Sequence, residues 1–261
     1  MKTKLEFSAY QDFEDGIKDV KFLLDLSKEH SGAEDKYKII LKSAILSLAT
    51  TFECFIEDVC SDFLFHFSNL RPVRKCLPDG MVYHMLGKVF CDESFISSVK
   101  HKKKSCLTKL DEILPVLLKE KPIRKINIEP KFSYGKHGAN EVKNLFSKIG
   151  VDDIFNECRL TTQSDSMLDS DDNELDLKGK IDSFTAIRNN IIHQNASPLL
   201  TIDEIQMYID LFVRFSCEII KCLEKRIINH RREMGRIQHN YSFYSSQEVV
   251  GYCFNINKDI C

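Results

Sequence analysis

The chain has 261 residues, of which 43% are hydrophobic and 29% are charged. This composition is sufficient to bury a core and excludes a chain that is disordered throughout. Lysine and arginine together number 37, and aspartate and glutamate 39, so the formal net charge is −2. A net charge this close to zero gives no overall electrostatic attraction for nucleic acid or an anionic membrane. Any RNA-binding site therefore has to be a local cluster of basic residues.

Several function classes are poorly supported because their motifs are missing. Ten cysteines include no C-x-x-C pair, and no P-loop, dinucleotide-binding, G-x-S-x-G or H-E-x-x-H motif is present. The N-terminus, MKTKLEFSAYQDFEDG, lacks the apolar run of a secretory signal. The most apolar stretch, residues 39–56, contains Lys42, Thr50 and Glu53 and falls short of the ~18 apolar residues of a membrane span. We expect a soluble cytoplasmic protein without membrane contact.

Two helices are predicted in the first part of the chain, where apolar residues recur at steps of three and four. The first begins near Ser8, covers residues 10–24 and ends at Ser31-Gly32. The second covers about residues 35–67 without proline or glycine and carries a long apolar face. We expect this second helix to be the principal core helix.

The middle region, about residues 72–160, is predicted to be an insertion into the helical bundle. It contains helical patterns over residues 81–89 and 107–118 and extended chain over residues 121–134. Asn140 is predicted to cap a short helix that ends before Gly150, in the position that favours glycine. An acidic stretch over residues 161–176 follows and is predicted to be a surface loop.

The last part of the chain predicts two more helices. One covers residues 177–191 and fades near Ser197-Pro198, and the other is opened by the capping box Thr201-Ile-Asp-Glu204 and runs to about Ile227. Residues 241–261 are expected to be a tail, either a short extended strand or a segment that docks a partner. The fold class is therefore all-α, with one helical domain over residues 1–240 and its core at about 35–230.

Polar residues gather at Arg188, Asn189, Asn190 and His193, near the end of an otherwise apolar helix. Asn189 and His193 lie about 40° apart on a helical wheel and share a face, whereas Arg188 lies about 140° from His193 and depends on its long side chain to reach back. Arginine offers a fork for a phosphate, asparagine orients, and histidine exchanges protons near neutral pH.

This set of groups suits RNA transesterification, in which the 2′-hydroxyl attacks the neighbouring phosphate and no metal ion or other cofactor is required. One histidine cannot serve as both base and acid in a single step, but two copies that face each other across a twofold axis can. If one chain acts alone, another of its histidines has to supply the second proton carrier: His30, His66, His84, His101, His137, His230 or His239.

The sequence Arg188-Asn189-x-x-x-His193, on a late helix of an all-α bundle, resembles the R-x(4–6)-H signature of HEPN-domain ribonucleases. The early helix around Glu53 and the segment over residues 132–150 are similar to the RiboL-PSP-like HEPN branch. The resemblance implies a HEPN-like bundle and metal-independent RNA cleavage by a homodimer, often in a toxin–antitoxin or phage-defence system. An antitoxin or an ATPase is then a candidate partner protein.

On this resemblance, Arg188, Asn189 and His193 are the candidate catalytic residues, while Glu53 and Asn190 are candidates to orient them. Simpler interpretations remain open. Arg188 and His193 can be cations favoured at a helix C-terminus, and Glu53 can be a buried acid with satisfied hydrogen bonds. The alternative function is a non-catalytic HEPN-like module that binds nucleotide or protein within a larger defence complex, and a plain helical scaffold is a third.

Two further basic features have weaker support. Lys102, Lys103 and Lys104 are candidate RNA-binding residues, although a run of lysines can equally be a solvated surface. A second pair with the required spacing, Arg232 and His239, is rejected because Glu233 follows the arginine and a glycine is expected to interrupt the helix.

Overall fold

The computed structural model describes residues 5–101, 108, 110–111, 114, 122–123, 126–133, 137–161, 174–197 and 200–255, with side chains as far as residue 236. The helices within these residues are α1 (Ser8–Glu29), α2 (Glu34–Asn69), the 3-10 helix η1 (Arg74–Cys76), α3 (Asp79–Phe90), α4 (Glu93–Lys100), α6 (Ala139–Lys148), α7 (Ile154–Glu157), α8 (Leu177–Gln194) and α9 (Ile202–Asn255). The predicted all-α fold class is confirmed.

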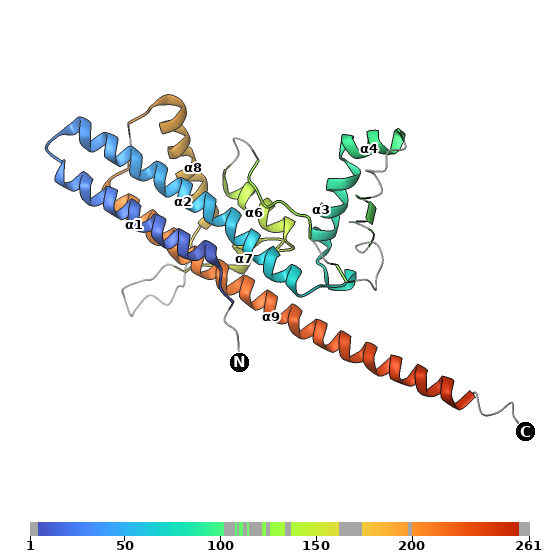
Figure 1. Ribbon diagram of the computed structural model, residues 1–261. Coiled ribbons are helices and arrows are strands. Elements are labelled where there is room, and N and C mark those ends of the chain that lie inside the picture. Colours follow the sequence, from blue (N-terminus) through green and yellow to red (C-terminus); the bar gives the residue numbers. More distant parts are fainter. Residues whose placement is uncertain are drawn as a thin grey trace, which may run out of the picture.

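Helices α1 and α2 form an antiparallel hairpin, along which the first half of α9 lies (Figure 1). Both helices cover the predicted residues, and α1 begins at Ser8 as expected. The N-terminus of α1 is capped from α2, because Asp62 accepts hydrogen bonds from the Ser8 hydroxyl at 3.2 Å and from the Ala9 amide at 3.0 Å. A carboxylate at this end also faces the positive end of the helix dipole.

Helix α2 is the centre of the core and contacts α1, α6, α8 and α9. Phe52 of α2 stacks on Phe212 of α9 with ring centroids 4.2 Å apart, and Phe184 of α8 meets the same Phe212 edge-on at 5.2 Å. On length and composition α2 could cross a membrane, but a buried core helix passes the same test. Most of its apolar side chains between Leu41 and Phe67 are buried against the neighbouring helices, whereas Phe65 is exposed.

The middle region differs from the prediction at the start of α6. Asn140 lies inside the helix and is not its cap, so that prediction is wrong. The acceptor comes instead from α8, where Asp182 Oδ1 accepts the Ala139 amide at 2.7 Å. The end of α6 agrees with the prediction, since Gly150 adopts a left-handed conformation with φ of 83°. Residues 126–133 are not helical, and most of the helix predicted over residues 107–118 lies outside the described residues.

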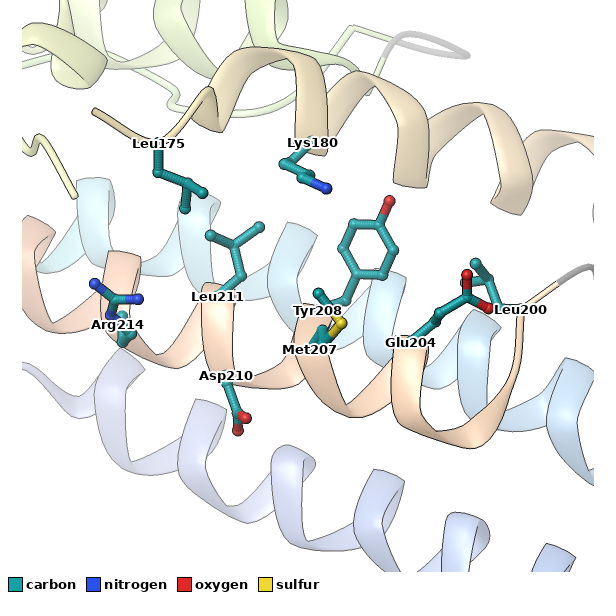
Figure 2. Close-up of a pocket in the computed structure, with 9 residues that line it drawn as sticks. All are labelled: Leu175, Lys180, Leu200, Glu204, Met207, Tyr208, Asp210, Leu211 and Arg214. Atoms are coloured by element: carbon teal, nitrogen blue, oxygen red, sulfur yellow. The ribbon is translucent and has the colours of Figure 1, made fainter. Parts of the chain in front are cut away.

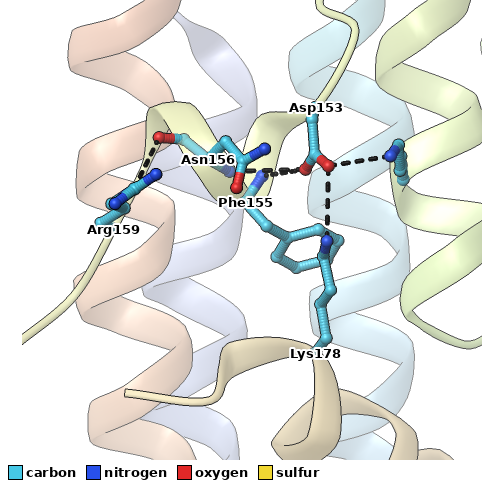
Figure 3. A network of polar contacts seen from close by, with 6 residues as sticks. Asp153, Phe155, Asn156, Arg159 and Lys178 are labelled. Atoms are coloured by element: carbon cyan, nitrogen blue, oxygen red, sulfur yellow. Dashed lines mark hydrogen bonds and ion pairs between the residues drawn. The ribbon is translucent and has the colours of Figure 1, made fainter. Parts of the chain in front are cut away.

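Asp153 connects three helices, α6, α7 and α8 (Figure 3). Its Oδ1 caps α7 by accepting the Phe155 amide at 3.1 Å, and its Oδ2 pairs with Lys143 of α6 at 2.8 Å and Lys178 of α8 at 3.3 Å. The hydrogen bond from Lys143 is the principal reason that the pKa of Asp153 is lowered. The N-terminal half of α8 is thereby fixed to α6 and α7.

The last helix is longer than the sequence predicts. The capping box is confirmed, because the Glu204 amide donates to Thr201 Oγ1 at 3.2 Å while Glu204 Oε2 accepts the Thr201 amide at 2.8 Å. Helix α9 then continues through Gly235 to Asn255 and extends past the bundle (Figure 1). The expectation of an extended tail is wrong for residues 241–255, because no proline follows Pro198 and nothing local stops helix propagation. Residues 256–261 and the acidic residues 162–173 lie outside the described residues.

Candidate functional site

Arg188 on α8 faces α2, where Glu53 is its counter-charge. Arg188 Nη2 lies 3.7 Å from Glu53 Oε2, and Arg188 Nη1 donates a hydrogen bond to Asn189 Oδ1 at 2.9 Å. The structure therefore brings together three of the residues named from the sequence. The guanidinium is turned across the helix toward α2, and its remaining N–H groups are available to another acceptor.

His137 completes this cluster, although no role beside Glu53 was predicted for it. His137 Nδ1 lies 3.3 Å from Glu53 Oε2, the same oxygen that faces Arg188. The His137 Nδ1 atom is buried, and Glu53 Oε2 is the polar atom that faces it among the described residues, at an angle outside that of a hydrogen bond. The side chains of His137, Glu53 and Arg188 are 18%, 21% and 18% exposed.

The chain around His137 is fixed at both ends. The Phe132 amide donates to Glu57 Oε1 on α2 at 2.7 Å, and the Ala139 amide donates to Asp182 on α8 at 2.7 Å. The Thr185 hydroxyl also donates to the His137 carbonyl at 3.4 Å. The contact with Thr185 and the neighbouring Ala139 amide hold the His137 backbone against α8.

Burial raises the pKa of the Glu53 carboxyl, while the positive charges of His137 and Arg188 act in the opposite direction and Glu57 adds to the rise. The cluster of Glu53, His137 and Arg188 lines a hollow together with the aromatic side chains of Phe52, Phe184 and Phe212. This hollow has a volume of only about 10 Å³. Such a hollow holds about one water molecule. A polynucleotide can therefore approach Arg188 only from outside, along the exposed surface of α8.

His193 lies on that exposed surface. Helix α8 is regular through Gln194, so Asn189 and His193 remain about 40° apart on one face. Asn189 is half-buried, whereas Asn190 and His193 are exposed. His193 makes no hydrogen bond or ion pair within the described part of the chain, and its imidazole is open to solvent or to a partner molecule.

The end of α8 is held by α2. Asn195 follows the helix in a left-handed conformation with φ of 49°, and its amide donates to the Asn190 carbonyl. Lys42 Nζ donates to both the Asn195 carbonyl oxygen at 3.0 Å and Asn195 Oδ1 at 2.8 Å. A cation at a helix C-terminus is favourable. Lys42 therefore fixes the last turn of α8, two residues after His193.

The basic residues elsewhere give a mixed result. Lys102, Lys103 and Lys104 lie outside the described residues. Lys221 pairs with Glu218 at 2.6 Å, an ordinary ion pair on a helix surface. The expected break in the helix between Arg232 and His239 is wrong, because α9 is continuous over these residues. The other reason for rejecting this pair remains, since Glu233 follows the arginine.

Figure 2 shows a larger hollow between α8 and α9, of about 370 Å³, to which Lys180 and Tyr208 contribute. Residues nine apart on an ideal helix point about 180° from each other, so Lys180 and Asn189 lie on opposite faces of α8. This hollow is thus separate from the Arg188 cluster.

Roles for His137, Asp182, Thr185 and Lys42 were not predictable from the sequence. His137 was singled out only as one of seven other histidines and as part of the segment that resembles the family. Asp182, Thr185 and Lys42 carried no local signal, because their partners are 43, 48 and 153 positions away in the chain.

Comparison with known proteins gives one match. The family model RiboL-PSP-HEPN matches residues 11–228, which include most of α1 and all of α2 and α8. No curated protein and no solved structure matches the chain significantly. The family match covers most of the chain, including Glu53, His137 and the Arg188-to-His193 segment. The protein belongs to the RiboL-PSP-HEPN family.

Proposed function

We propose that this protein is an endoribonuclease that cleaves RNA by attack of the 2′-hydroxyl, without a metal ion. The observation that carries the proposal is the arrangement on α8: Arg188 is held between Glu53 and Asn189, and His193 stands one turn beyond Asn189 on the same face of the helix, with its imidazole exposed. Membership in a HEPN family supports an RNA-related function for this site.

Each group has a chemical role in the proposed reaction. Arg188 binds the scissile phosphate and stabilises the negative charge that grows on its oxygens. His193 transfers the proton, either from the 2′-hydroxyl or to the leaving 5′-oxygen. Asn189 orients the guanidinium through its side-chain oxygen, and Glu53 does so from α2.

The proposed active unit is a homodimer, because one R-x4-H motif supplies one exposed imidazole and the step requires a base and an acid. Exposed Ile192, beside His193, is a candidate contact between the two copies. The proposed setting is the cytoplasm, with the protein acting as a toxin or phage-defence effector that an antitoxin or ATPase partner regulates.

Purified protein incubated with total RNA in EDTA tests the proposal against an Arg188→Ala/His193→Ala variant. The parent is expected to cut RNA and the variant to leave it intact while keeping the same circular dichroism and melting temperature. Equal cutting by both would show that these residues are not the site. RNA binding without cutting by the parent would favour the alternative, a non-catalytic module in a larger complex.

A further inference from the structure

Glu53 is shared by two partners, His137 and Arg188, that come from different parts of the chain. One oxygen, Oε2, lies 3.3 Å from His137 Nδ1 and 3.7 Å from Arg188 Nη2. A carboxylate on a helix rotates about three side-chain bonds, and a single long contact with Arg188 leaves that rotation poorly restrained. The second contact, with His137, adds a restraint on the same carboxylate oxygen.

His137 is well placed to act on Glu53 and badly placed to act on RNA. Its backbone is tied to α8 through Thr185 and through the neighbouring Ala139 amide, and its ring packs beside Phe132 with centroids 5.8 Å apart. The hollow that it lines with Arg188 has room for about one water molecule. The imidazole therefore reaches Glu53 but no substrate-sized space.

We propose that His137 is a positioning residue: its Nδ1 holds the Glu53 carboxylate in place, and Glu53 in turn orients the Arg188 guanidinium for the phosphate. The consequence for catalysis rests on the proposed function, whereas the ordering of Arg188 by His137 does not. Orientation of a phosphate-binding group affects the transition state more than the initial binding of RNA.

The decisive comparison uses His137→Asn, His137→Gln and His137→Ala. Asparagine places an N–H donor where His137 Nδ1 stands, while glutamine places one where the far nitrogen, Nε2, stands. His137→Ala is expected to lower kcat about tenfold with KM changed less than twofold. His137→Asn should restore kcat to within about threefold of the parent, and His137→Gln should behave as His137→Ala. Tyr83→Ala, which removes an exposed ring from α3, is the control and should keep the parental kcat.

A double variant tests whether His137 acts through Glu53. If it does, adding His137→Ala to Glu53→Ala should lower kcat by less than twofold beyond Glu53→Ala alone, because Glu53→Ala already removes the contact. Independent, multiplicative losses would overturn the proposal. Rescue by glutamine but not asparagine would also overturn it, since the important atom would then be Nε2.

A measurement without RNA separates this proposal from the proposed function. The Arg188 Nε–H resonance in a ¹⁵N NMR spectrum, assigned by its loss in Arg188→Lys, reports how firmly the guanidinium is held. His137→Ala should speed its exchange with water several-fold, and His137→Asn should keep the parental rate. Unchanged exchange in His137→Ala would refute the positioning role. If the parent cuts no RNA but this pattern is found, the proposed function fails and the positioning role stands.

Discussion

Replacing Lys42 with methionine should loosen the end of α8 and slow RNA cleavage. The methionine keeps the aliphatic part of the side chain but removes both hydrogen bonds to Asn195, at 3.0 and 2.8 Å, and the charge at the helix C-terminus. A charged hydrogen bond contributes about 1.5–3 kcal/mol when well shielded, and a cation at an exposed helix end about 0.3–1 kcal/mol. Lys42 is half-buried, so we expect a loss of about 1 kcal/mol in the free energy of unfolding.

This loss should lower the melting temperature by about 2–4 °C in a chain of this size. Since His193 lies two residues before Asn195, a comparable loss in transition-state stabilisation corresponds to about a fivefold lower kcat/KM. The control is Lys38→Met, one turn earlier on α2, where the lysine pairs only with exposed Glu34.

Thermal melts, hydrogen exchange at the Ala196 amide and cleavage of a fluorescent RNA provide the three measurements. The Ala196 amide donates to the Asn190 carbonyl at 3.3 Å, so its exchange reports opening of the last turn even if no RNA is cut. Equal exchange and equal activity in Lys42→Met and Lys38→Met would refute the reasoning that Lys42 anchors this turn.

Three other predictions concern separate parts of the structure. Burial raises the pKa of Glu53 in the folded state, so the native protein binds more protons than the unfolded chain. The free energy of unfolding of the parent, measured by denaturant titration, should therefore fall relative to that of Glu53→Gln as pH rises above about 4.5. Parallel pH curves for the two proteins would contradict this. Gly150→Ala should lower the melting temperature, since its φ is 83° and a Cβ would stand 2.4 Å from Pro78 ring carbons, whereas Gly87→Ala, with open space, should not. Titrating His193→Ala chains into the parent should reduce activity in proportion to heterodimer formed, and activity that follows parental chain alone would contradict a shared site.

Local patterns were sufficient to predict most of the helices. Apolar residues at three- and four-residue steps located α1 and α2, and the Thr201–Glu204 capping box located the start of α9 to within one residue. These signals depend only on neighbours in the chain. The extent of α9 was missed because its apolar pattern weakens after about Ile227, although nothing in the following sequence stops the helix.

The candidate site was predictable only in its local part. The Arg188, Asn189 and His193 spacing was readable because all three belong to one helix, and the resemblance added Glu53. The contact between Glu53 and His137 joins residues far apart in sequence, and it depends on the hydrogen bonds of Phe132 to α2 and of Ala139 to α8. The cap of α6 was misplaced for the same reason, since its acceptor, Asp182, belongs to α8.

The most direct test of the central claim is the chemistry of the product ends. A short RNA that the protein cuts should be cleaved in excess EDTA, leaving a 2′,3′-cyclic phosphate and a 5′-hydroxyl, and the same RNA with one 2′-deoxy nucleotide at the cut site should stay intact. Cleavage that requires a divalent metal ion and leaves a 5′-phosphate would contradict the account, because water activated by a metal would then be the nucleophile.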